Sequence, residues 1–197
     1  MEPTTSWDEP AQQLRELTDL VVRAGRSAPP PELQGLLEQA TELLRPLAAP
    51  AQQVIAEDEA TMQTVETMDH DRSMLTGTAN PIAPPVRKAE HNGSAEARAN
   101  LGLAYQGPPG RVHGGMLAAL LDHTLGGAQP RDRARFTRTL TIDYLAGTPL
   151  YTDLVVTARA EETTGRKVWL NGEITVDGQV TARARGLWVG PRDPDLD

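Results

Sequence analysis

The chain has 197 residues, a net charge of −8 and no cysteine, and 39% of its residues are hydrophobic. This length predicts one catalytic-sized domain with an extension, or two small domains, with enough apolar residues for a core. The lack of cysteine excludes disulfides, thiolate metal sites and a cysteine nucleophile. No apolar run is long enough to span a bilayer and no signal-like segment begins the chain, so we expect a soluble, cytoplasmic protein.

The negative charge is concentrated in the N-terminal part of the chain. Residues 1–80 contain 14 acidic and 5 basic side chains, whereas residues 81–197 contain 13 acidic and 14 basic ones. Nucleic-acid-binding proteins present basic surfaces to the phosphates, so this balance argues against a nucleic acid partner.

Apolar residues at helical spacing within residues 14–21 and 33–47 predict two N-terminal helices. A proline-rich break at residues 27–31 separates them, and a weaker third helix is predicted from Gln52 to about Met68. So few short helices cannot enclose a core alone, so we expect them to pack on the rest of the chain or on a partner chain. We assign residues 1–70 to a helical extension and residues 71–79 to a linker.

From residue 80 the sequence changes to a β pattern. The prolines of residues 80–85 exclude a helix and suit an edge segment that leads into a strand before residue 93. A second strand is predicted over residues 95–106, and a helix from about residue 114 to residue 126. Apolar and polar residues then alternate within residues 136–144, 154–162, 167–176 and 180–189, with turns at Gly165 and Asp177-Gly178.

These elements predict an α+β fold in which four antiparallel strands follow two strands and one long helix. An antiparallel sheet curled around the helix is the simplest way to bury it. Six of the seven aromatic residues lie after position 100, which places the main core in this part. We assign residues 80–190 to this domain and residues 191–197 to a C-terminal tail.

The segment from residue 107 to residue 122 carries the strongest functional signal. His113, Gly114 and Gly115 open an apolar helix after a Gly-Pro-Pro-Gly turn. A helix start offers unpaired N–H groups, and glycines let a ligand atom approach them without interference from a Cβ. The alternative is a helix start packed tightly against a strand, with His113 as a capping or core histidine.

Asp122 is the one carboxylate in this helix, and an Asp inside an apolar helix is costly to bury without a task or a partner. It follows Gly115 by seven residues, roughly 10 Å along the axis, on a face of small residues. One carbonyl cannot reach both places in a single chain, so the pattern predicts a dimer with shared sites. The alternative is a structural Asp held by a hydroxyl or an amide. His113, Asp122 and His123 lack the spacing of a helical zinc site, and we predict no metal.

The stretch Gly107-Pro-Pro-Gly-Arg-Val-His-Gly-Gly, followed by a helix with Asp122, resembles the hotdog-fold thioesterases. The resemblance is greatest to the branch that contains the phenylacetate-pathway (PaaI-like) thioesterase and the mammalian thioesterase superfamily members. It extends through residues 137–144, the turn at residues 165–167 and the strand at 182–189, and covers about residues 80–190. It implies a hotdog fold, and the N-terminal helices lie outside it.

The resemblance also implies roles for individual residues. Asp122 matches the acidic residue that activates water or attacks a thioester carbonyl, and Thr137 matches a Ser/Thr that positions the water. Gly114 matches the residue whose N–H polarises the carbonyl, and His113 the histidine that shapes the helix start. Some relatives carry an Asn as a second carbonyl donor at the position of Gly107, so here either Gln106 or a backbone amide replaces it, or polarisation is weaker.

The same resemblance implies an acyl-CoA substrate, no separate cofactor, and a homodimer or a tetramer. Arg166 and Lys167 lie at a turn that can meet the nucleotide end of coenzyme A, although two solvated turn charges explain them equally well. The arginines at positions 131, 133, 135 and 138 carry the same ambiguity.

Thr137 alternates with Phe136 and shares a predicted strand face with Thr139 and Thr141. We expect this polar face to pack on the helix and line the site; otherwise the threonines merely suit a β-strand.

The leading hypothesis is therefore acyl-CoA thioester hydrolysis with Asp122 as general base or nucleophile. A hotdog dehydratase or hydratase is a second hypothesis, although the histidine–acid pairing it needs is not evident. A non-catalytic acyl-CoA-binding or assembly protein is a third.

Overall fold

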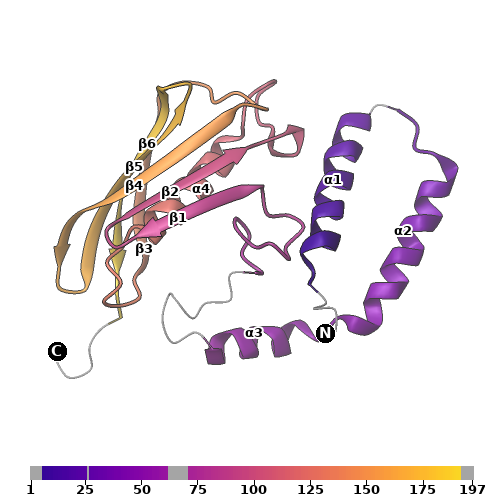
Figure 1. Ribbon diagram of the computed structural model, residues 1–197, viewed down its shortest axis with the longest axis horizontal. Helices are drawn as coiled ribbons and strands as arrows, with labels where there is room; N and C mark the ends of the chain where they lie inside the picture. The colour runs from indigo at the N-terminus through magenta and orange to yellow at the C-terminus, as the bar shows by residue number, and fades with distance from the viewer. Residues whose placement is uncertain (1–5, 26, 62–70, 192–197) are drawn as a thin grey trace.

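The structure is a computed structural model that describes residues 6–25, 27–61 and 71–191. Three helices come first and a six-stranded antiparallel sheet with one long helix follows (Figure 1). The helices are α1 (Asp8–Ala24), α2 (Pro31–Leu44), α3 (Ala51–Thr61) and α4 (Gly114–Gly127). The strands are β1 (Val86–His91), β2 (Ser94–Asn100), β3 (Phe136–Tyr144), β4 (Asp153–Thr164), β5 (Lys167–Val176) and β6 (Gln179–Val189).

The strands lie in the order β1-β2-β4-β5-β6-β3, and every pair of neighbours is antiparallel. The two predicted hairpin turns are present, with positive φ at Gly165 in the first and at Asp177 and Gly178 in the second. The sheet curves around α4, as Figure 1 shows. The predicted order of two strands, one helix and four strands, and the predicted hotdog arrangement, are confirmed.

The core lies between α4 and the concave face of the sheet. The helix contributes Leu117, Leu120, Leu121 and Leu125, all almost fully buried. Alternate residues of the central strands face them, because successive side chains of a strand point to opposite faces. Among the largest of these are Leu154, Leu170, Ile174 and Trp188. Burial of this apolar face fixes which side of α4 remains open.

One predicted boundary is wrong, and another lies outside the described residues. The second strand ends at Asn100 instead of residue 106, because its partner β4 begins at Asp153, opposite Asn100. The chain beyond it therefore turns, and residues 103–105 form the 3₁₀ helix η3 (Leu103–Tyr105). The third N-terminal helix is described only to Thr61, and the rest of its predicted span, residues 62–68, lies outside the described residues.

The N-terminal helices contact the rest of the chain unequally. Helix α1 lies beside η3, and the guanidinium of Arg15 donates hydrogen bonds to the carbonyls of Asn80 at 2.8 Å and Thr78 at 3.2 Å. Helix α2 has no buried residue and stands away from the sheet (Figure 1). The expected packing on the rest of the chain is therefore found for α1 and not for α2. No helix among the described residues is long and apolar enough to cross a membrane.

Candidate active site

Helix α4 begins with a histidine that caps its first turn. The Nδ1 atom of His113 accepts a hydrogen bond from the Gly115 amide at 2.9 Å, and the His113 backbone is extended, as is usual at an N-cap. The Gly114 amide has no hydrogen-bond partner among the described residues. Of the two glycine amides proposed for ligand contact, the Gly115 N–H is thus already bonded and the Gly114 N–H is the free one.

Gly107 is a glycine because His113 lies against it. A Cβ at position 107 would lie 2.8 Å from the Cα of His113 and 3.3 Å from its Cδ2, too close for a side chain in this conformation. The neighbouring Gln106 accepts a hydrogen bond from the Gly110 amide on its Oε1 at 2.9 Å. Gln106 therefore stabilises the turn. Position 107 has no room for a side chain that could donate a hydrogen bond to a substrate carbonyl.

Asp122 lies on the side of α4 that the sheet does not cover. The Thr137 hydroxyl donates a hydrogen bond to Oδ1 of Asp122 at 2.9 Å. Asp122 is half-buried, as are Ala118 and Ala119 on the same side. The structure thus brings two predicted site residues together. A carboxylate held in this way, with small neighbours, can take a proton from water or attack a carbonyl carbon.

A β-bulge in β3 turns Thr137 toward the helix. Thr137 pairs with the buried Trp188 on β6, whereas Thr139, two residues later, pairs with the next residue on β6, Leu187. Paired residues share a sheet face, so Thr137 points inward with Trp188 and Thr139 points outward. The prediction that Thr139 and Thr141 share the face of Thr137 is therefore wrong, because the extra residue shifts the alternation.

Tyr144, at the other end of β3, is a site residue that sequence reasoning missed. Its hydroxyl donates a hydrogen bond to the carbonyl of Gly114 at 2.9 Å, and its ring lies 3.4 Å from the place of a Gly114 Cβ. The alternating pattern of the strand marked Tyr144 only as an apolar-face residue. Strand β3 thus contacts α4 at both halves of the candidate site, at Asp122 through Thr137 and at Gly114 through Tyr144.

The two halves lie too far apart to serve one carbonyl group in a single chain. Gly114 and Asp122 are eight residues apart in a continuous helix, which corresponds to about 12 Å along the axis. Strand β3 forms an edge of the sheet, and it exposes large apolar side chains at Phe136 (55%) and Tyr144 (53%), followed by Leu145 (53%). An edge with apolar side chains is suited to pairing with another chain.

Comparison with known proteins shows what the segment around the candidate site is similar to. Residues 109–183, which contain His113, Gly114, Asp122 and Thr137, match the model of the thioesterase superfamily. The segment that holds the candidate site is therefore similar to the thioesterase superfamily. The acyl-coenzyme A thioesterase THEM4 of Rattus norvegicus is 34% identical over 96 residues, which cover 48% of this chain and 41% of that protein. THEM4 of Xenopus laevis is 37% identical over 91 residues, which cover 45% of this chain and 41% of that protein.

Solved structures have a similar fold. The crystal structure of a thioesterase superfamily protein superposes on 94% of this chain and 91% of its own, with a TM-score of 0.76 and 29% identity. The superposition on the Escherichia coli PaaI protein, from the phenylacetic acid degradation operon, covers 54% of this chain and 80% of that protein. Its TM-score is 0.52, and the two sequences are 20% identical. The first superposition is long enough to include the N-terminal helices of this chain. The chain spans about two fifths of the length of the THEM4 relatives it matches.

Cationic side chains gather at the end of the sheet nearest Asp122. Arg166 donates a hydrogen bond to the Gly190 carbonyl at 3.2 Å, and a Cβ at Gly190 would lie 3.3 Å from Cδ of Arg133. The exposed Lys167 pairs with Val189 on β6, and Val189 also pairs with Phe136, the residue before Thr137. The predicted substrate-binding turn and the Asp122–Thr137 pair therefore lie at the same end of the sheet.

His123, beside Asp122 in the sequence, faces a different element. Its Nε2 lies 3.1 Å from Nζ of Lys88 on β1 and 3.3 Å from the hydroxyl of Thr76. This arrangement places the His123 ring toward β1, whereas Asp122 contacts β3. The two neighbours therefore belong to separate clusters.

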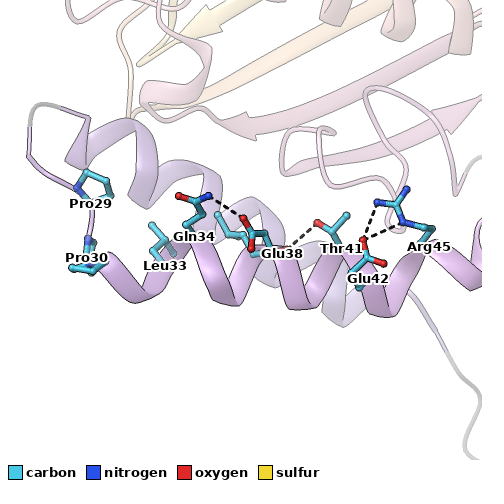
Figure 2. A pocket seen from close by; sticks show the side chains of 10 residues that line it. Pro29, Pro30, Leu33, Gln34, Glu38, Thr41, Glu42 and Arg45 are labelled. Carbon is cyan, nitrogen blue, oxygen red and sulfur yellow. Dashed lines mark hydrogen bonds and ion pairs between the residues drawn. The ribbon is translucent and has the colours of Figure 1, made fainter.

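An open groove of about 530 Å³ lies on α2, away from this site (Figure 2). All of its lining residues come from residues 29–45, and Figure 2 shows Gln34 bonded to Glu38 and Arg45 to Glu42 along the helix. The groove adds no residue to the Asp122 or Gly114 halves of the site.

Proposed function

We propose that this chain hydrolyses an acyl-CoA thioester to a carboxylic acid and free coenzyme A. The observation that carries the proposal is the Asp122 carboxylate, held by Thr137 at 2.9 Å on the open side of a helix whose first amide has no partner among the described residues. The family match and the acyl-coenzyme A thioesterase relatives support the substrate class.

In the proposed reaction the Gly114 N–H donates a hydrogen bond to the thioester oxygen as negative charge develops on it. Asp122 acts in one of two ways. As general base it takes a proton from water while the water oxygen attacks the carbonyl carbon; as nucleophile it forms an anhydride that water then opens. In both cases the C–S bond breaks, and the thiolate leaves and takes up a proton. The Thr137 hydroxyl, bonded to Asp122, positions the attacking water.

We propose that the site is completed by a second copy of the chain. The separation of about 12 Å between Gly114 and Asp122 keeps them from sharing one carbonyl in the same chain. A two-fold axis that pairs the exposed β3 edges would place the Gly114 end of one copy near Asp122 of the other. The apolar Phe136, Tyr144 and Leu145 side chains would then be covered.

The cations at the end of the sheet nearest Asp122 support docking of the coenzyme A phosphates. We assign Lys167 and the exposed part of Arg166 to this contact, since opposite charge attracts a nucleotide group. Part of the Arg166 side chain already holds Gly190, so Lys167 is the freer of the two cations.

The direct test is thiol release by the purified full chain from a panel of short, long and aromatic acyl-CoAs. The wild type should hydrolyse some of them, and Asp122→Asn should lower kcat by about 10²-fold or more because the proton acceptor is lost. Unchanged release in Asp122→Asn would overturn the assigned mechanism. Tight acyl-CoA binding without turnover would instead favour a binding protein, and addition or loss of water at the acyl chain a hydratase or dehydratase.

A further inference from the structure

We propose that the Nε2–H group of His113 is the second hydrogen-bond donor to the thioester carbonyl, acting beside the Gly114 amide. This inference rests on the proposed function and assigns to His113 a catalytic contact in addition to its capping bond. Gly107 carries no side chain and Gln106 holds the Gly110 amide, so a second donor to the carbonyl has to come from another residue.

The capping bond decides which ring nitrogen carries the proton. Nδ1 of His113 accepts the Gly115 N–H at 2.9 Å, so Nδ1 must present a lone pair. A neutral imidazole with an accepting Nδ1 carries its proton on Nε2, which is then a donor. Nε2 has no protein partner among the described residues, and the side chain is exposed in the single chain. The His113 Nε2–H therefore lies at the helix start without a hydrogen-bond acceptor among the described residues.

The packing of the ring sets where this N–H lies. The Cδ2 side of the ring lies against Gly107, 3.3 Å from the place of its absent Cβ. The Cε1 side lies against Gly115, 3.2 Å from the place of that Cβ. Nε2 is the ring atom between Cδ2 and Cε1, so it stands at the open vertex between the loop and the helix start.

The neighbouring polar side chain is committed elsewhere. Gln106 uses its Oε1 to hold the Gly110 amide at 2.9 Å, which directs its amide group to the turn. His113 directly precedes Gly114, so its ring and the Gly114 N–H belong to one rigid cap. Donors fixed before reaction stabilise an oxyanion without reorganisation, and loss of one such donor typically lowers kcat by about 10²- to 10³-fold.

Two substitutions separate the donor from the cap. His113→Ser keeps a good N-cap and removes the Nε2–H, whereas His113→Gln loses the cap but extends an amide N–H to about the reach of Nε2. We expect His113→Ser to retain thermal stability and to lose roughly 10²-fold in kcat, with KM little changed. His113→Gln should be less stable and yet have the higher kcat. A merely structural role predicts the reverse order of kcat.

The carbonyl itself provides a second readout that needs no turnover. In an Asp122→Asn background, bound acyl-CoA labelled with ¹³C at its carbonyl should show a lowered C=O stretching frequency in the infrared. His113→Ser should diminish this shift, His113→Gln should restore part of it, and His91→Ser, at the end of β1, should leave it unchanged.

The outcomes separate the two proposals. The donor assignment alone is overturned if the wild type turns over substrate but the C=O frequency shift does not change in the His113 variants. It is also overturned if Gln106→Glu, and not a His113 variant, abolishes the shift. A kcat order that follows stability overturns it as well. A shift that depends on His113 in a wild-type protein without turnover supports the donor and overturns the proposed function.

Discussion

Three glycines around the start of α4 have three different surroundings. Gly107 makes room for the backbone and ring of His113, Gly115 for the capping nitrogen of that ring, and Gly114 lies against the ring of Tyr144. A Cβ at Gly114 would make only ordinary contact with Tyr144, so the space there is not the reason for its assigned role. At this position the amide is the functional group.

A proline at position 114 tests that amide directly. Gly114→Pro removes the N–H while keeping a residue that suits the first position of a helix, and the extended His113 backbone is compatible with a following proline. We expect kcat to fall by about 10²- to 10³-fold, as for loss of an oxyanion donor. Gly114→Ala, the matched control, keeps the N–H and should stay within a few-fold of the wild type. Equal losses in both variants would contradict the role of the amide.

Gly107→Ala tests the packing argument by a stability measurement. The added Cβ would meet His113 Cα at 2.8 Å, and neither backbone can yield without a shift. Overpacking of this kind typically costs about 1–3 kcal/mol. Urea unfolding should show this loss, and Gly35→Ala on α2, with open space around its Cβ position, should not show it. An unaltered midpoint for Gly107→Ala would contradict the argument.

The sequence indicated His113, Asp122 and Thr137 as site residues because the histidine, the carboxylate and the hydroxyl occur in a recognisable pattern. The bond of Tyr144 to Gly114 and that of Gln106 to Gly110 were not predictable. The first depends on how β3 lies across α4, and the second on the geometry of a turn. Neither is expressed in residue type or periodicity.

Among the elements, the connection from α4 to β3 positions Thr137 against Asp122. The Gln129 side chain accepts from the Arg135 amide at 3.0 Å and donates to the Arg135 carbonyl at 3.3 Å. The buried Arg135 guanidinium binds both carboxylate oxygens of Asp132, at 2.8 and 3.0 Å. These bonds hold the short connection in one conformation directly before β3.

This pairing predicts a pH dependence of stability. The hydrogen bond from Arg135 is the main reason that the pKa of Asp132 lies below its ordinary value. As the pH falls through the ordinary carboxylate range, near about 3.9, the unfolded chain binds the proton first and the pairing's contribution is lost. In urea unfolding, Asp132→Asn should be less stable than wild type at neutral pH, and the difference should shrink toward about pH 3. A difference independent of pH would contradict the assignment.

Elements with strong periodicity were predicted well, and irregular ones were not. Strand β5 runs from Lys167 to Val176 as expected, because alternation and turn residues marked both of its ends. The bulge in β3 was missed because an extra residue leaves composition unchanged and alters only pairing. The early end of β2 depends on where β4 begins, which is a long-range property.

The whole molecule combines a well-packed hotdog domain with an acidic helical region attached through α1. Sequence patterns located these helices but could not predict that α2 would have no buried residue, because its apolar spacing is that of a helix with a packing partner. The same patterns did predict that Gly114 and Asp122 could not form one site in one chain. The continuous helix between them supports that conclusion.

Mixed dimers test the shared site most directly. Asp122→Asn and Gly114→Pro chains, each inactive alone, are co-expressed with different affinity tags, and the heterodimer is purified and assayed for thiol release. If Gly114 of one chain and Asp122 of the other form a site, one site of the heterodimer contains both unchanged residues. The other site contains both substitutions. We predict about half of the wild-type activity per dimer, by the symmetry of a two-fold assembly. Heterodimers as inactive as the two parent variants would contradict the shared site.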